Sequence, residues 1–173
     1  MSYKVDFAAA DLNYQVELLK HFPEIANARF YPAMNRAARE VKSAIGSRMT
    51  FQDRSGNARR ELSSKVSGRG LNISARVGWF GNVSAYYVNV LEHGADPHVI
   101  GFVPRLGVQF GKNNPHPGVP PLKFVEGGFN DAKGMVEAEM ETASALVVAD
   151  LEVKQWREAL RRGWTICARC GAP

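Results

Sequence analysis

The sequence predicts an α+β fold in which an antiparallel sheet of about four strands is packed by an N-terminal helix and a long C-terminal helix. Apolar residues recur every three or four positions in residues 32–49 and again from residue 130 onward, which predicts the two helices. Alternation of apolar and polar residues between 61 and 91 predicts the strands. The 173 residues suit one domain, with 1–155 as its folded part, 97–121 as a long loop or arm within it, and 156–173 as a helix end and tail.

The N-terminal region predicts two helices that a proline separates. Asp11 is a candidate N-cap for a short first helix, which Phe22-Pro23 ends. Pro32 suits the first turn of a second helix. The apolar stripe of this second helix consists of Met34, Ala37, Val41, Ile45 and Met49.

The C-terminal helix is expected to begin near Asn130 or Asp131, either of which could cap it. Its apolar stripe runs from Ala132 to Leu151 and continues through Trp156 and Leu160. Such a helix has roughly thirty residues and spans about 45 Å. A small sheet cannot cover that length, so we expect its distal end to contact another partner.

Three strands are predicted in the middle of the chain. Residues 61–67 and 72–79 alternate and are joined across Gly68-Arg69-Gly70, which indicates a hairpin. The β-branched and aromatic run from Ala85 to Leu91 then predicts a third strand, which ends at Glu92-His93-Gly94. An antiparallel meander is the simplest arrangement of these strands.

The segment 97–121 is rich in Gly, Pro and Asn, and one brief strand is expected in it at Val108-Gln109-Phe110. Loops of this length inside compact domains are usually functional, or ordered only when a partner binds. We therefore expect a mobile arm that becomes ordered on assembly.

The net charge of +5 comes from 22 basic and 17 acidic residues, an excess that favours contact with a polyanion. Several basic residues follow the helix at 32–49, but no aromatic residues are interleaved with them as a stacking platform for single strands requires. An ordinary solvated surface is therefore preferred over direct reading of DNA. No apolar run approaches the roughly 20 residues that cross a bilayer, and no secretory signal is visible, so the chain is expected to stay where it is made.

Candidate catalytic residues gather between Glu92 and His98. The spacing of His93 and His98 is not the helical pair of zinc proteases, and neither a nucleophile elbow nor a phosphate loop is present. The pair Cys167 and Cys170 lacks the second pair of a zinc site. The sequence thus predicts no catalytic residue, cofactor or metal ligand. Two alternatives remain open: a metal-dependent hydrolase that uses His93 and His98, and a basic nucleic-acid-binding module.

Three segments carry a resemblance to a known family. The first is Ser55-Gly56-Asn57-Ala58-Arg59, the second ends in Val90-Leu91-Glu92-His93-Gly94, and the third is Pro120-Pro121-Leu122-Lys123-Phe124. In this order they resemble the Thr-Gly-x-Leu-Arg, Val-Glu-x-Gly and Pro-Pro-x-Pro-Phe segments of the tail-completion, or neck, family of long-tailed double-stranded DNA bacteriophages. The likeness covers roughly residues 8–155. Ala58 stands where that family has leucine, and Lys123 where it has proline.

The resemblance implies a structural virion protein of the phage neck, made in the host cytoplasm, without catalysis and without a membrane. Such proteins form homo-oligomeric rings, commonly hexameric, that contact head-closure or connector proteins on one side and tail terminator or tail tube proteins on the other. The subunit interface is expected to include Tyr86, Tyr87, Glu92, His93, Phe110, Phe124 and Trp156. Non-specific contact with genomic DNA in the lumen is expected from Arg54, Arg59, Arg60, Lys65 and Arg69.

Overall fold

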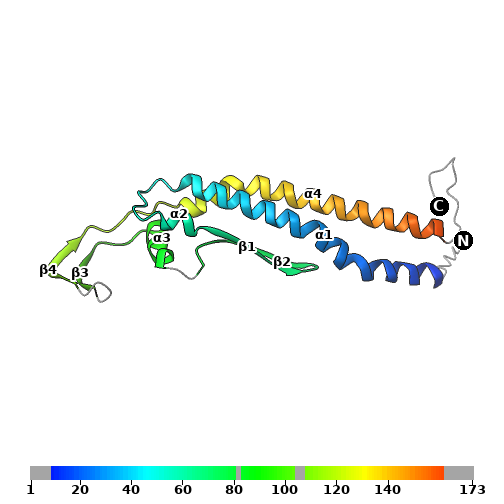
Figure 1. Cartoon of the computed structure of the whole chain (residues 1–173), viewed down its shortest axis with the longest axis horizontal. Coiled ribbons are helices and arrows are strands. Elements are labelled where there is room, and N and C mark those ends of the chain that lie inside the picture. Colours follow the sequence, from blue (N-terminus) through cyan, green and yellow to red (C-terminus); the bar gives the residue numbers. More distant parts are fainter. Residues whose placement is uncertain (1–8, 81–82, 104–107, 162–173) are drawn as a thin grey trace, which may run out of the picture. The chain divides into compact units, whose positions relative to one another are not determined.

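The structure is a computed structural model that describes residues 9–80, 83–103 and 108–161 (Figure 1). These residues form a mixed helix and sheet fold of four helices and two small antiparallel sheets. In chain order, the elements are α1 (Ala9–Arg48), α2 (Asn57–Glu61), β1 (Ser63–Arg69), β2 (Asn72–Gly78), α3 (Val83–His93), β3 (His98–Val103), β4 (Val108–His116) and α4 (Phe124–Arg161).

The chain divides into two compact units. The first comprises Met1–Ala37, Val66–Ala75 and Val136–Pro173, and the second comprises Ala38–Lys65 and Arg76–Met135. Helices α1 and α4 are continuous through the division, so each contributes one part to each unit.

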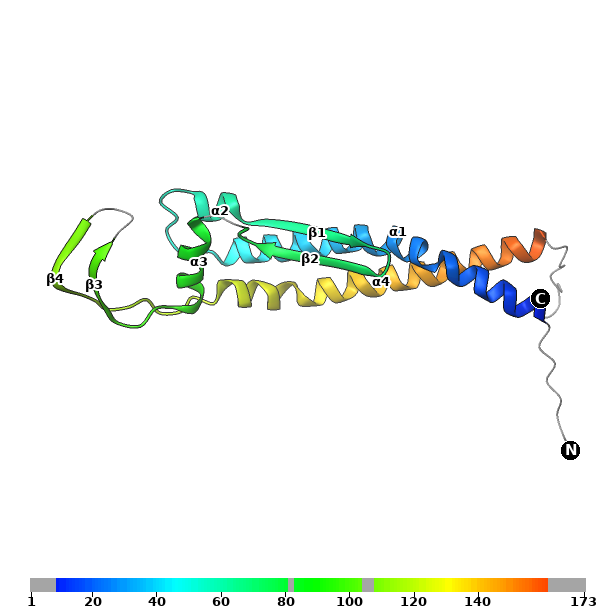
Figure 2. The ribbon, with the colours of Figure 1, turned by 90° about the horizontal axis from the view of Figure 1, so that it is seen from below.

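In the first unit, the parts of α1 and α4 lie side by side (Figures 1 and 2). Small side chains allow this approach, and the buried ones are Ala26, Ala33, Ala37 and Ala143 together with Val147. Two ion pairs join the helices: Arg29 Nη2 donates to Asp150 Oδ1 at 2.8 Å, and Arg36 Nη2 lies 2.8 Å from Glu139 Oε2. The end of the β1–β2 hairpin is held by Asn27, whose Oδ1 accepts a hydrogen bond from Gly70 N at 3.0 Å.

In the second unit, the core lies between the end of α1, α3 and the start of α4. Its buried residues are Ala38, Val41, Ile45, Met49, Ala58, Leu62, Val88, Leu91, Phe124 and Ala132. The two long helices approach closely at Gly128, where a Cβ atom would lie 2.6 Å from Ile45 Cα. A larger residue at this position would force the helix backbones apart.

The prediction of two N-terminal helices is wrong, because α1 runs unbroken from Ala9 to Arg48 through Pro23 and Pro32. A proline in a helix interior removes one hydrogen bond and crowds the preceding turn, which is why the sequence pattern favoured a break. Both prolines are exposed, and the segment between them carries Arg29 and the buried Ala26. Packing against α4 therefore stabilises the helix across both positions.

The predicted strand from Ala85 to Leu91 is also wrong, since these residues lie in helix α3. Val88, Leu91 and Glu92 are buried, whereas Tyr86, Asn89 and His93 are exposed. This pattern has the period of a helix, and the β-branched and aromatic composition of the run was only a weak preference that packing overrode.

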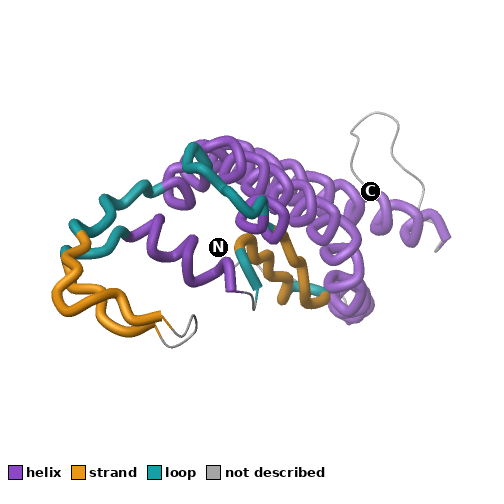
Figure 3. The backbone as a smooth tube through the Cα atoms, turned by 60° about the vertical axis from the view of Figure 1, so that its left-hand side comes forward, coloured by secondary structure: helices purple, strands orange, loops and turns teal. Residues whose placement is uncertain are grey.

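The predicted four-stranded sheet is replaced by two separate two-stranded sheets, β1–β2 and β3–β4, which Figure 3 shows as two pairs of orange strands. The hairpin of β1 and β2 is confirmed, although its turn is Gly70-Leu71, with Gly70 at φ +65°. The predicted antiparallel meander is wrong, because the residues expected to form its third strand lie in helix α3.

The segment expected to be a loop at 97–121 contains the β3–β4 hairpin, in which His98 pairs with His116 and Val103 with Val108. Val108-Gln109-Phe110 is a strand as predicted, within the longer β4. The prolines and glycines that indicated a loop are compatible with strands here, because Pro97 precedes β3 and the irregular register between Ile100 and Phe102 accommodates extra residues.

Helix α4 begins at Phe124, earlier than the predicted Asn130 or Asp131, and continues through Trp156 to Arg161. The glycine pair Gly127-Gly128 weakens local helix propensity, which moved the predicted start too far along the chain. Cys167 and Cys170 lie outside the described residues. No helix within 9–80, 83–103 and 108–161 is both long and apolar enough to cross a membrane.

Candidate functional site

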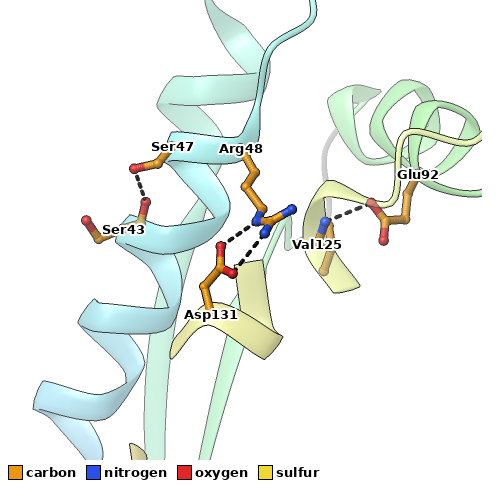
Figure 4. A network of polar contacts seen from close by, with 6 residues as sticks. All are labelled: Ser43, Ser47, Arg48, Glu92, Val125 and Asp131. Atoms are coloured by element: carbon orange, nitrogen blue, oxygen red, sulfur yellow. Dashed lines mark hydrogen bonds and ion pairs between the residues drawn. The ribbon is translucent and has the colours of Figure 1, made fainter. Parts of the chain in front are cut away.

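Parts of the three segments singled out in the sequence, residues 53–59, 91–95 and 118–126, lie in the second unit, and we call them the motif junction. Its central group is Glu92, in the last turn of α3, which is 9% exposed. Glu92 Oε2 accepts a hydrogen bond from Val125 N at 2.8 Å (Figure 4). Its Oε1 accepts a second hydrogen bond, from Glu126 N, at 3.0 Å. The carboxylate thereby satisfies two of the free N–H groups at the start of α4 and lies at the positive end of its dipole.

Backbone hydrogen bonds hold the chain before α4 against the end of α3. Ala95 N donates to Val119 O at 2.9 Å, Val119 N donates to Ala95 O at 2.8 Å, and Leu122 N donates to Leu91 O at 2.9 Å. The entry into α4 therefore has a fixed path, and Lys123 adopts φ +48° immediately before the helix.

Two glycines make this close approach possible. Gly94 has φ +79°, and a Cβ atom there would lie 2.7 Å from Val119 O. Gly118 has φ +84°, and a Cβ atom there would lie 2.3 Å from Ala95 O. Both the left-handed backbone and the lack of space exclude larger residues at these positions.

The segment 53–59 contributes a second set of polar contacts. Asp53 Oδ2 accepts a hydrogen bond from Arg59 N at 2.9 Å, and Ser55 Oγ donates to Asp53 Oδ1 at 3.3 Å. The backbone hydrogen bond from Arg59 is the main cause that lowers the pKa of the Asp53 carboxyl below its ordinary value. The Arg59 guanidinium donates to Met49 O and, at 3.4 Å, to Gly46 O. It thus caps the carbonyl groups at the end of α1.

An aromatic cluster fills the centre of the junction around Phe124, which is 2% exposed. The ring of Phe124 lies 5.3 Å from that of Phe51 and 6.2 Å from that of Trp79, centre to centre. Trp79 Nε1 donates to Ala58 O at 2.6 Å. Phe124, expected from the sequence at a subunit contact, is therefore almost wholly buried within its own chain and leaves almost no surface for a second chain.

Next to the junction, Arg48 and Asp131 join the end of α1 to the start of α4 (Figure 4). Arg48 Nη2 donates to Asp131 Oδ1 at 2.8 Å, and Arg48 Nε donates to Oδ2. Hydrogen bonding from Arg48 is the main cause that lowers the pKa of Asp131. In the same region Ser47 Oγ donates to Ser43 O at 3.0 Å within α1.

The histidines considered as metal ligands bind backbone groups. His93 Nδ1 lies 3.1 Å from Asn89 O, and His98 Nδ1 lies 2.8 Å from Asp96 O. The His98 ring stacks on that of His116 at 4.9 Å, an arrangement in which the two rings face each other and do not converge on one ion. Within the part of the chain that the structure describes, no three His, Cys, Asp or Glu side chains are grouped to hold a metal ion.

Apart from Phe110, the other residues that were expected at subunit contacts or at DNA are either exposed or in contact with a neighbouring side chain. Tyr86 is 79% exposed, Tyr87 is 48% exposed with its ring edge against Phe51, and Trp156 is 37% exposed. Phe110 lies in β4. Arg60 donates to Asn57 Oδ1, whereas Arg54, Lys65 and Arg69 are exposed.

The capping role of Glu92 and the contributions of Arg48, Asp53, Gly118 and Asp131 were not predicted from the sequence. A local signal existed only for Asp53, because Asp-x-Ser-Gly indicates a turn that a carboxylate can cap. Arg48 and Asp131 are distant in sequence, so nothing local links them.

Comparisons of the chain with protein-family models, with curated proteins and with solved structures found no match.

Proposed function

We propose that this chain is a structural protein of the bacteriophage neck, which completes the tail and joins it to the DNA-filled head as one subunit of a hexameric ring. The observation that carries the proposal is the motif junction. The second and third segments that resemble the neck family are distant in sequence, yet they bind each other through Glu92 and through the backbone of Ala95 and Val119. Trp79 links the first segment to them, because its Nε1 donates to Ala58 O and its ring packs against that of Phe124.

The chemistry of the junction supports a structural role without catalysis. Glu92, Asp53 and Arg59 are the groups that an enzyme could use, and each binds backbone atoms of its own chain. A general acid, base or nucleophile must instead reach the substrate. These side chains stabilise the fold, and the function belongs to the surfaces that the fold presents.

Exposed aromatic residues supply candidate surfaces for neighbouring subunits. Tyr86 on α3 and Trp156 near the end of α4 retain apolar area in the single chain. Aromatic side chains are enriched in protein interfaces, and a closed ring requires two different surfaces that bind each other. The partners in this proposal are further copies of the chain, the head-closure or connector proteins, and the tail terminator or tail tube proteins, all within the virion.

Imaging of phage particles made without this protein tests the proposal. We expect filled heads without tails beside free tails, and restoration of tailed particles by the wild-type chain supplied in trans. Normal numbers of tailed, infectious particles in its absence would contradict the proposal.

Measurement of the native mass of the purified protein tests the ring. We expect Tyr86→Ala to shift the assembly toward the monomer while the circular dichroism of the chain is unchanged, because the side chain is exposed. Leu71→Ala is the matched control, since Leu71 is 60% exposed at the β1–β2 turn and its replacement is expected to leave assembly intact.

Metal analysis of the purified protein tests the hydrolase alternative. Stoichiometric zinc or manganese that is lost in a His93→Ala/His98→Ala variant would favour that alternative.

A further inference from the structure

Two cations lie directly opposite each other on the β1–β2 hairpin. A two-residue turn at Gly70-Leu71 closes the hairpin and sets its register. Two contacts agree with this register: Ser63 Oγ donates to Gly78 O at 3.4 Å, and Ser67 Oγ lies 3.3 Å from Ser74 Oγ. This register places Lys65 on β1 opposite Arg76 on β2. Side chains opposite each other in an antiparallel pair have Cβ atoms about 4.5–5.5 Å apart.

No carboxylate among the described residues neutralises this pair. The sequence has no Asp or Glu between Glu61 and Glu92. Among the described residues, neither Lys65 nor Arg76 forms an ion pair, and both are exposed. Lys65 Nζ lies 4.6 Å from the centre of the Phe80 ring, a contact that holds the ammonium group but leaves its charge in place. Like charges directly opposite each other destabilise a sheet, so the pair costs stability in the free chain.

The same side of each strand continues with polar groups. Along β1, Ser67 and Arg69 alternate with Val66, and along β2, Ser74 and Asn72 alternate with Ile73. These outward residues are cations, hydroxyl groups and an amide. A protein interface has an apolar centre and is depleted in lysine, whereas these side-chain types are the ones that contact DNA phosphates.

We propose that Lys65 and Arg76 form a phosphate-binding pair for the backbone of double-stranded DNA. An anionic phosphate between the two side chains would remove their repulsion and gain charge-assisted hydrogen bonds. The identification of this DNA with the phage genome rests on the proposed function, but the binding itself requires no ring. The proposal adds Arg76 to the expected DNA contacts, and it removes Arg59, whose guanidinium caps α1.

Binding of a labelled double-stranded DNA of mixed sequence by the purified full chain, measured by fluorescence anisotropy over a series of salt concentrations, tests this proposal. Each lost phosphate contact lowers the slope of log K against log salt by about 0.9. We therefore expect Lys65→Gln/Arg76→Gln to lower this slope by about two and to weaken binding at least tenfold at low salt. The matched control is Arg39→Gln/Arg157→Gln, which removes the same charge from two exposed helical positions and is expected to keep the wild-type slope.

Equal losses in the two variants, or no salt-dependent binding by the wild type, would overturn the proposal. Polyglutamate serves as a second probe, and tighter binding of polyglutamate than of DNA through the same pair would assign the hairpin to an acidic protein instead. Arg76→Gln alone is expected to weaken DNA binding and to raise the midpoint of thermal unfolding, because it relieves the repulsion. Weaker DNA binding together with a higher unfolding midpoint would show that Arg76 contributes to binding and not to folding. If particles without the protein assemble normally but the DNA result holds, the proposed function fails and the phosphate pair stands.

Discussion

At the scale of single residues, Glu92 shows how far side-chain identity alone can mislead. Glu92 lies beside His93, and a glutamate next to a histidine is a pair of residue types common in active sites. The Glu92 carboxylate nevertheless caps helix α4. The end of an element at Glu92-His93-Gly94 could be predicted from the sequence, although the element is a helix and not the expected strand. The role of Glu92 could not, because its two hydrogen-bond donors, Val125 and Glu126, belong to another helix, and no local rule connects them.

Replacement of Glu92 by alanine is expected to lower the free energy of unfolding by about 1–3 kcal/mol, because a cap is lost and two backbone donors in a half-buried place lose their acceptors. Urea denaturation monitored by circular dichroism measures this change. Glu92→Gln keeps one acceptor and should lie between the wild type and the alanine variant. His93→Ala is the control, since this neighbour is exposed and should change stability by less than about 0.5 kcal/mol. Equal effects at 92 and 93 would show that the cap does not stabilise the chain.

Asp53 makes stability depend on pH in a defined direction. Its pKa is lowered in the folded chain from an ordinary value of 3.8, mainly by the hydrogen bond from Arg59 N. The folded state therefore favours the ionised carboxylate. The resulting stabilisation is fully present above the unfolded pKa and is lost as the pH falls through the folded one. We expect the Asp53→Asn variant to lose less stability than the wild type between pH 5 and about pH 3, as measured by urea denaturation at each pH. Parallel pH profiles for the two proteins would contradict this assignment.

At the scale of elements, the sequence predicted the helices and strands whose apolar pattern repeats many times or whose partner is close in the chain. The helix ending near residue 49 and the β1–β2 hairpin were predicted for this reason. Helix α3 was missed because eleven residues give few repeats of the period and because their composition favours strands. The continuity of α1 across Pro23 and Pro32 depends on ion pairs and packing with α4, which no local pattern reports.

Two glycines of α4 offer a matched test of helix packing. Gly128→Ala places a Cβ atom 2.6 Å from Ile45 Cα and should destabilise the chain by about 1–3 kcal/mol, because a backbone atom cannot move aside. At Gly134 a Cβ atom would meet nothing within 4 Å, so Gly134→Ala should stabilise the chain by about 1 kcal/mol through helix propensity alone. Thermal and urea denaturation of both variants measures the difference. The same sign of change at both positions would refute the close helix contact.

At the scale of the whole molecule, the chain consists of two compact units that share two long helices. The sequence indicated one domain and a helix too long for its core. The division into two units could not be predicted, because the first unit combines three segments and the second combines two, all of them distant in sequence. The distal part of α4 carries apolar side chains that remain exposed, such as Val153 and Trp156.

Truncation after Asp150 is expected to leave a folded chain with weakened assembly. The ion pair of Asp150 with Arg29 is retained, whereas the exposed Val153 and Trp156 are removed. Circular dichroism should show a cooperative thermal transition, and native mass measurement should show a smaller assembly than for the full chain. Trp156→Ala in the full-length chain is the companion variant and should weaken assembly in the same direction. A truncated chain without a cooperative transition would show that the distal helix is required for folding.

Gly94 and Gly118 have a consequence for tracing the ancestry of this chain. At each position a side chain would clash with a backbone oxygen of the opposite segment. Only glycine is therefore tolerated at these two positions as long as the two segments remain paired. Side chains on the surrounding helices can diverge until ordinary sequence comparison detects no kinship. We therefore expect distant relatives to retain this pair of glycines together with the acidic residue two positions before the first. That three-point pattern would find them when overall identity no longer does.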